Sequence, residues 1–182
     1  MSACVPPLAK KVVWRRSNLC RLLAALNREP AVTGTVGRHT MHIEPIPLQT
    51  HGDSRGMLVS LEQERNVPFP IRRVYYLFAT SRDVHRGMHA HRRLNQLAVA
   101  VRGSVTFLLD DGSGPTEVTL DDPAQGLLLG SMVWRDLYAF SDDCVLMVLA
   151  DQLYDPADYI TDYDEFLREV RGVPRVEGTV AW

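Results

Sequence analysis

Short hydrophobic runs follow one another along the chain from residue 41 onward, and turn-forming residues separate them. Runs rich in Val, Leu, Tyr and Phe that lie between Gly, Pro, Asp and Ser are typical of β-strands. Their spacing of roughly ten residues, with no helical segment between them, favours an antiparallel sandwich or barrel. The pattern predicts strands at 58–61, 74–78, 97–101, 105–109, 117–120, 127–129, 132–134 and 145–149.

The C-terminal part of the chain has a helical pattern instead. Pro156 near the start of this part and Gly172 after its end are typical of helix boundaries. We therefore expect an all-β domain followed by a short C-terminal helix between residues 155 and 172. The hydrophobic residues that recur at helical spacing are Tyr159, Tyr163, Phe166, Leu167 and Val170.

The charges divide the chain near residue 41. The whole chain has 20 basic and 22 acidic residues, but residues 1–40 contain seven Lys and Arg against the single acid Glu29. The remaining residues are therefore acidic, and both lysines of the protein precede them. We predict a basic N-terminal extension at 1–40, partly helical or disordered, and a folded domain at 41–182.

Other interpretations of the extension remain open, because a short apolar stretch at 19–26 follows its first basic residues. It could be a signal peptide, or a helix that binds a membrane surface or nucleic acid. Arg21 interrupts the apolar stretch, which favours a plain extension with neither partner. No run of 18 apolar residues predicts a transmembrane helix. Three cysteines without paired spacing indicate a reducing, cytoplasmic environment.

Two histidines stand two positions apart, at His89 and His91. In a strand such residues point to the same face. With Gly87, Gln96 and Gly103 their spacing resembles the first motif of the cupins, which are small jelly-roll barrels. In metal-binding cupins, an HxH pair, a Glu and a later His surround the ion. Here Gln96 takes the place of the Glu and no His follows His91, so we expect no metal and assign the pair to proton transfer.

A closer resemblance extends over about residues 43–170. The segment Arg86–Arg92, Gln96 and Asp110–Gly112 resemble the signature of the sugar nucleotide 3,4-ketoisomerases, which are WxcM-like cupins. Further similar blocks lie at 53–56, 66–69, 73–76, 133–134, 144–150 and 154–155.

The resemblance implies a cupin-type double-stranded β-helix, or jelly roll. It also implies a cofactor-free enzyme of deoxysugar biosynthesis that moves the carbonyl of dTDP-4-keto-6-deoxyglucose from C4 to C3. Family members are typically homodimers that exchange strands near the N-terminal part of the cupin.

We expect His89 and His91 to transfer the proton, and Tyr76, Arg86 and Gln96 to position the substrate or stabilise charge. The diphosphate is assigned to Arg55, Arg73 and Arg135, and Arg73 should share a strand face with Tyr75. Trp134 is the candidate for stacking on thymine. Family members often have a His where this chain has Arg135, which we interpret as variation around the substrate.

Alternatives to the ketoisomerase are a jelly-roll sugar nucleotide epimerase and a non-catalytic cupin that binds a sugar nucleotide. A metal-dependent oxygenase ranks last because the ligand set is incomplete.

Overall fold

The computed structural model describes residues 43–172. The chain divides into two units, Met1–Thr33 and Gly34–Trp182, and every described residue belongs to the second. The basic extension expected at 1–40 and the domain start expected at 41 lie outside the described residues.

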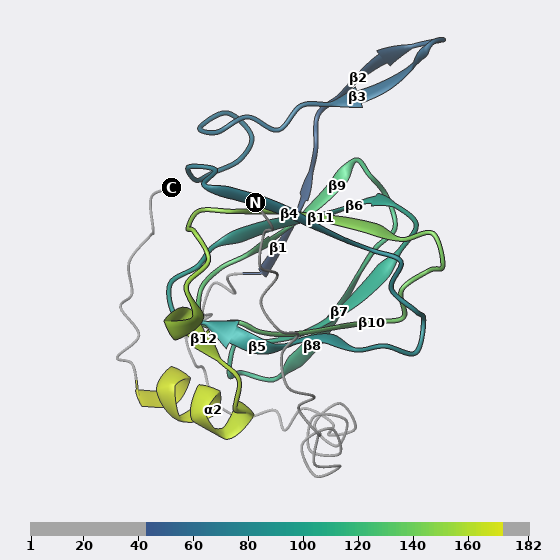
Figure 1. The fold of residues 1–182 in the computed structure, drawn as a ribbon. Coiled ribbons are helices and arrows are strands. Elements are labelled where there is room, and N and C mark those ends of the chain that lie inside the picture. The colour runs from purple at the N-terminus through teal and green to yellow at the C-terminus, as the bar shows by residue number, and fades with distance from the viewer. Residues whose placement is uncertain (1–42, 173–182) are drawn as a thin grey trace, which may run out of the picture. The chain divides into compact units, whose positions relative to one another are not determined.

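Two five-stranded sheets face each other and form the domain (Figure 1). Every ladder between their strands is antiparallel. The first sheet has the order β1 (Ile43–Pro47), β9 (Gln125–Leu129), β6 (Gln96–Arg102), β11 (Val145–Ala150) and β4 (Arg73–Phe78). The second has the order β12 (Tyr159–Ile160), β5 (Arg86–His91), β10 (Trp134–Tyr138), β7 (Val105–Asp110) and β8 (Pro115–Leu120).

Three smaller elements complete the described part. The hairpin β2 (Thr50–Asp53) and β3 (Gly56–Val59) extends away from both sheets, at the upper right of Figure 1. A 3₁₀ turn, η1 (Pro156–Asp158), leads into β12, and the helix α2 (Tyr163–Gly172) follows. The jelly-roll class with a short C-terminal helix, predicted from the sequence, is confirmed.

The hydrophobic core lies between the two sheets because alternate residues of each strand point inward. Leu109, Leu127 and Leu146 are fully buried there, and each contributes roughly 1.5–3 kcal/mol by leaving water. Towards one end of the strands, polar side chains line the inner surface instead of apolar ones, and the candidate site lies there.

The structure corrects two predicted elements. The strand expected at 132–134 is a turn up to Val133, where Met132 has a φ of +54°, and β10 begins only at Trp134. The helix expected from residue 155 begins at Tyr163, because Tyr159 and Ile160 pair as a strand with His91 and Ala90. Asp162 accepts a hydrogen bond from the Glu165 amide at 2.7 Å and so caps the helix that does form.

The helix α2 packs on the outer face of the second sheet. The Trp134 ring lies 5.1 Å from Tyr163 and 5.7 Å from Phe166, measured between ring centroids. Arg92 of the loop after β5 binds Glu165 at 2.8 Å and Glu169 at 2.6 Å. These contacts hold the C-terminal segment against β5, the strand that carries both histidines.

Candidate active site

A pocket of about 360 Å³ lies between the two sheets. Its inner part is apolar and is continuous with the core, whereas cationic, phenolic and imidazole groups line the remainder. Both sheets contribute to it, together with the segment between β11 and β12. The lining residues are Arg73, Tyr75, Leu77, Arg86, Gly87, His89, Gln96, Ala98, Phe107, Leu129, Arg135, Leu137, Leu146, Val148, Tyr154 and Tyr159.

A β-bulge in β5 places the histidines in this pocket. Arg135 pairs with His89 while the next residue of β10 pairs with Gly87, so Met88 is the extra residue of the bulge. Gly87 has a φ of +87°, and a Cβ atom there would lie 2.8 Å from the Arg135 carbonyl oxygen. Both the backbone conformation and the close approach therefore require glycine at this position.

The two imidazole rings contact each other through their Nε2 atoms, which are 3.1 Å apart. Their Nδ1 atoms point away from the contact, His89 to the Gly87 carbonyl at 2.9 Å and His91 to the Asp158 carboxylate at 3.2 Å. A carbonyl and a carboxylate only accept hydrogen bonds, so both Nδ1 atoms carry a hydrogen. The neutral pair then has two unprotonated Nε2 atoms that face each other and can bind one additional proton between them.

The pocket keeps the histidine pair neutral at physiological pH. Burial, and after it the nearby Arg135 cation, lower the pKa of His89 to about 4. Burial, Arg135, His89 and Arg73 together lower the pKa of His91 to about 2. Two unprotonated imidazoles are therefore ready to act as a base when a substrate enters.

A chain of polar side chains faces the histidines from the other strands. Arg135 is 3% exposed and donates to Gln96 Oε1 and to the backbone oxygens of Val133 and Gly130, at 3.0 and 3.3 Å. Because Gln96 Oε1 accepts from Arg135, its Nε2 donates to Tyr75 Oη at 2.8 Å. The Tyr75 hydroxyl hydrogen is then free to point into the pocket.

Arg135 is a buried cation with no acidic partner among its hydrogen-bond acceptors. Burial lowers the pKa of Arg135 to about 10, which still leaves the guanidinium charged at neutral pH. A buried charge interacts strongly with any anion that forms beside it, because the local dielectric constant is low. Arg135 and Tyr75 together can therefore stabilise an oxyanion in the pocket.

A second cation, Arg73, lies between two tyrosine rings. Its guanidinium carbon is 5.3 Å from the centre of the Tyr75 ring and 5.8 Å from that of Tyr154. Its Nε atom is buried and has no hydrogen-bond partner. A buried N–H donor without an acceptor is suited to an anionic ligand group.

The structure brings most of the predicted site residues together. Arg73, Arg86, His89, Gln96 and Arg135 line the pocket, and His91 contacts His89. Among residues 43–172, no group of three or more His, Cys, Asp or Glu side chains is arranged to hold a metal ion.

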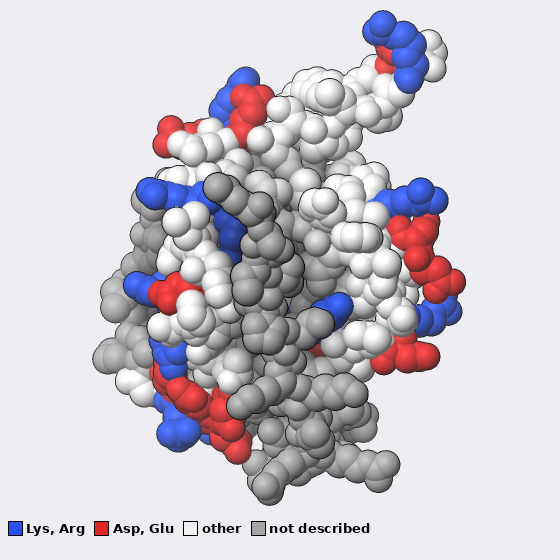
Figure 2. Space-filling view, viewed as in Figure 1, with Lys and Arg blue, Asp and Glu red and all other residues white. Residues whose placement is uncertain are grey.

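Three predicted site residues lie elsewhere. Tyr76 is 64% exposed on the outer face of β4, because side chains alternate along a strand and Tyr75 takes the inner face. Trp134 is 1% exposed beneath α2 and is not accessible to a ligand. Arg55 lies at the tip of the β2–β3 hairpin and pairs with Asp53 at 2.6 Å. Figure 2 shows basic and acidic side chains together at this tip.

Sequence reasoning missed Tyr75, Tyr154, Tyr159 and Asp158 as site residues. Tyr75 could have been chosen, since the expected alternation puts it on the same face as Arg73. Asp158 could not, because nothing in the sequence indicates that a residue 67 positions after His91 contacts it.

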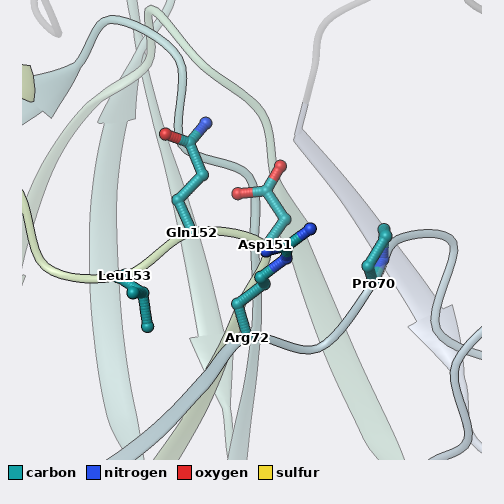
Figure 3. Close-up of a pocket in the computed structure, with 5 residues that line it drawn as sticks. All are labelled: Pro70, Arg72, Asp151, Gln152 and Leu153. Carbon is teal, nitrogen blue, oxygen red and sulfur yellow. The ribbon is translucent and has the colours of Figure 1, made fainter.

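Another hollow of about 410 Å³ lies beside the start of β4 (Figure 3). It is lined by Pro70, Arg72, Asp151, Gln152 and Leu153. The Asp151 carboxylate already accepts hydrogen bonds from the Asn95 backbone and side chain, at 3.0 and 2.8 Å. Among the described residues that line it, the hollow therefore has no imidazole and no other base without hydrogen-bond partners. We assign the chemistry to the pocket between the sheets.

Comparisons with known proteins show the family to which the chain belongs. A family model described as "FdtA: WxcM-like, C-terminal" matches residues 41–171. The chain belongs to this family. The TDP-4-oxo-6-deoxy-alpha-D-glucose-3,4-oxoisomerase of Aneurinibacillus thermoaerophilus is 50% identical over 118 residues, which are 65% of this chain and 85% of the relative.

Solved structures give the same result. A 3,4-ketoisomerase from Helicobacter canadensis is 39% identical, with a TM-score of 0.70 over 72% of this chain and 98% of its own. A variant of QdtA from Thermoanaerobacterium thermosaccharolyticum, in complex with TDP-4-keto-6-deoxyglucose, is 35% identical, with a TM-score of 0.70 over 72% and 95%. Among residues 43–172, no helix is long and apolar enough to span a membrane.

Proposed function

We propose that this member of the WxcM-like family is a sugar nucleotide 3,4-ketoisomerase that converts dTDP-4-keto-6-deoxyglucose into a dTDP-3-keto-6-deoxyhexose. The sequence-based prediction of an isomerase of this kind is confirmed by its relatives, which are 3,4-ketoisomerases. The observation that carries the proposal is the histidine pair, whose two Nε2 atoms leave room for one proton in a pocket that also holds Arg135 and Tyr75.

The reaction moves two protons and leaves the atom count unchanged. The C4 carbonyl acidifies the hydrogen on C3, and the histidine pair removes it as a proton. The C3–H electrons form the C3=C4 double bond, and the carbonyl electrons move to O4, where Arg135 and Tyr75 stabilise the charge. O4 then gains a proton and O3 loses one. As the C3 carbonyl forms, the pair returns its proton to C4.

The substrate assignment explains why several cations gather in an acidic domain. The hexose would occupy the apolar part of the pocket, and the diphosphate would contact Arg73 and Arg86. Trp134 is buried, so we assign the aromatic contact with the nucleotide to Tyr154, which is exposed beside Arg73. We place the reaction in the cytoplasm, as the cysteine usage predicts.

The test of this function is the product itself. We expect ¹³C NMR of purified protein with dTDP-4-keto-6-deoxyglucose to show the carbonyl at C3, with a chelator present. In deuterated water, an epimerase would exchange hydrogens on the sugar ring for deuterium while the carbonyl stayed at C4. Conversion that stopped on chelation would indicate a metal enzyme, and no conversion of any 4-keto sugar nucleotide would favour the binding module.

A second copy of the chain, in our proposal, covers the part of the outer face of the first sheet that lies at β4, whereas Val67 and Phe69 already cover the face at β6 and β11. β4 is the edge strand of this sheet, and its outer residues Val74, Tyr76 and Phe78 are exposed. The hairpin exposes Met57 and Leu58 as well. Exposed apolar side chains beside an open strand edge are typical of a strand-pairing interface. Within one chain Arg55 lies on the hairpin and does not line the pocket. The prediction that it binds the diphosphate therefore holds only if the dimer brings the hairpin to the pocket of the other copy.

Replacing Tyr76 and Phe78 by Glu should therefore convert a dimer into a monomer. Two carboxylates at the centre of an apolar interface would lose their hydration on association. Sedimentation velocity at micromolar concentration measures the change, and Thr119→Glu, an exposed position on the other sheet, is the control that should stay dimeric. A monomeric wild-type protein would refute the proposal.

A further inference from the structure

A buried carboxylate contacts the histidine pair at His91 Nδ1, on the side of the ring opposite the Nε2 contact. Asp158 of η1 is 4% exposed, and its Oδ2 accepts a hydrogen bond from His91 Nδ1 at 3.2 Å. Its other oxygen accepts from the Arg93 amide at 3.0 Å and from Arg93 Nε at 3.3 Å. The proton transfer described above uses the Nε2 atoms of the pair and leaves this contact without a role.

We propose that Asp158 is a positioning residue, which holds the N–H of His91 at Nδ1 and stabilises the positive charge when the pair binds the proton from C3. The proposal rests on the ketoisomerase function. It assigns to Asp158 no contact with the substrate, since the His91 ring lies between them.

The tautomer of His91 decides whether the pair can accept a proton at its Nε2 contact. With the hydrogen at Nδ1, His91 Nε2 is an acceptor facing the acceptor Nε2 of His89, and one proton fits between them. With the hydrogen at Nε2, that position is already filled before the substrate arrives. A carboxylate at Nδ1 fixes the first arrangement, because its lone pairs would repel an unprotonated Nδ1.

Charge makes the same contact necessary after the proton is taken up. Arg135 and Arg73 both oppose a positive charge on His91, and His89 does so too. Asp158 is the acidic side chain among residues 43–172 that His91 contacts directly. The imidazolium formed in the reaction therefore has its counter-charge in Asp158. This carboxylate also interacts with the Arg135 cation and with Arg93, whose side chain is largely exposed.

The turn that carries Asp158 is held independently of its side chain. The Arg92 amide donates to the Asp158 carbonyl at 2.9 Å, and Tyr159 pairs with His91 in the sheet. The Arg92 side chain also binds the carbonyls of Ala157 and Tyr159, at 3.2 and 3.1 Å. Replacing the carboxylate by an amide should thus leave the turn in place, because the amide oxygen can still accept from the Arg93 backbone, and should change mainly what His91 contacts.

The experiment compares Asp158→Asn with Asp155→Asn. Asp155 caps the same turn through the Ala157 amide at 2.9 Å and does not contact either histidine. We expect Asp158→Asn to lower kcat by about 100-fold or more while KM changes by less than about twofold. Asp155→Asn should retain kcat within about threefold of the wild type.

Nitrogen-15 NMR of the imidazoles supplies a measurement that a purely structural role would not change. We expect His91 to carry its hydrogen at Nδ1 in the wild type and in Asp155→Asn, and to shift towards Nε2–H in Asp158→Asn. Wild-type His91 with its hydrogen at Nε2, or an Asp158→Asn variant with unchanged kcat, would overturn the proposal. If the wild type converts no keto sugar, the ketoisomerase function fails, and the tautomer of His91 still decides the positioning role by itself.

Discussion

Replacing His89 by Asn should lower kcat for 3,4-isomerisation by about three orders of magnitude, because a positioned general base contributes roughly 10²–10⁴-fold. Asn has no group that accepts a proton near neutral pH, and the Nε2 contact with His91 disappears with the ring. Substrate binding should change less, since the diphosphate is assigned to arginines elsewhere in the pocket. Steady-state kinetics with NMR detection of the 3-keto product measures both quantities.

The matched control is His85→Asn. His85 precedes the same strand but lies outside the pocket, where its Nδ1 contacts Asp136 at 2.8 Å and its ring stacks on Tyr138. This variant should keep the wild-type kcat below its unfolding temperature. Loss of activity in His85→Asn equal to that in His89→Asn would mean that the fold of β5, not the base, had been removed. Full activity in both His89→Asn and His91→Asn would refute proton transfer by the pair.

Most strands were predictable from the sequence because short apolar runs between turn-forming residues are a local property. The runs at 74–78, 97–101, 105–109 and 145–149 all lie within strands of the structure. The two-residue alternation of side chains along a strand also predicted that His89 and His91 share a face, and their ring centroids are 4.7 Å apart. Elements shaped by long-range pairing were missed, as with β12, which exists because Tyr159 and Ile160 pair with β5.

The sequence predicted the site residues that can be recognised without knowing which strands and segments lie next to each other. His89 and Gln96 were identified from residue type and spacing, and Arg135 was chosen as a cation for the diphosphate that the resemblance implies; all three line the pocket. Trp134 is buried because Tyr163 and Phe166 of α2 cover it, and the sequence predicts the apolar face of this helix without indicating the strand on which it packs. Asp158 was missed because its contact with His91 depends on where the C-terminal segment returns to β5.

The pocket therefore combines a local motif with a charge pattern that only the three-dimensional structure reveals. Arg135 serves two purposes at once. It lowers the pKa of both histidines, which keeps the base unprotonated. In the proposed reaction it also faces O4, where negative charge develops. The effect of Arg135 on the histidine pKa values changes the pH profile of the reaction, whereas stabilisation of the oxyanion changes the rate at every pH. The two effects can therefore be measured separately.

Arg135→Gln should lower kcat/KM by about 100-fold, the order expected when one donor to a developing oxyanion is removed. The pH profile should change as well. Loss of the cation raises the pKa of His89 and His91 from their depressed values, so the acid limb of kcat/KM should move to higher pH. Burial still holds both pKa values below that of a free histidine, so the limb should stay below about pH 6.5.

The control for Arg135→Gln is Arg102→Gln, which removes a surface cation paired with Asp143 at 3.1 Å and should alter neither the rate nor the pH profile. Thermal unfolding of both variants shows whether the fold is retained. A folded Arg135→Gln protein with a kcat/KM within about threefold of the wild type would exclude charge stabilisation by Arg135. A lowered rate with an unmoved acid limb would instead restrict Arg135 to the oxyanion and leave burial alone to keep the histidine pair neutral.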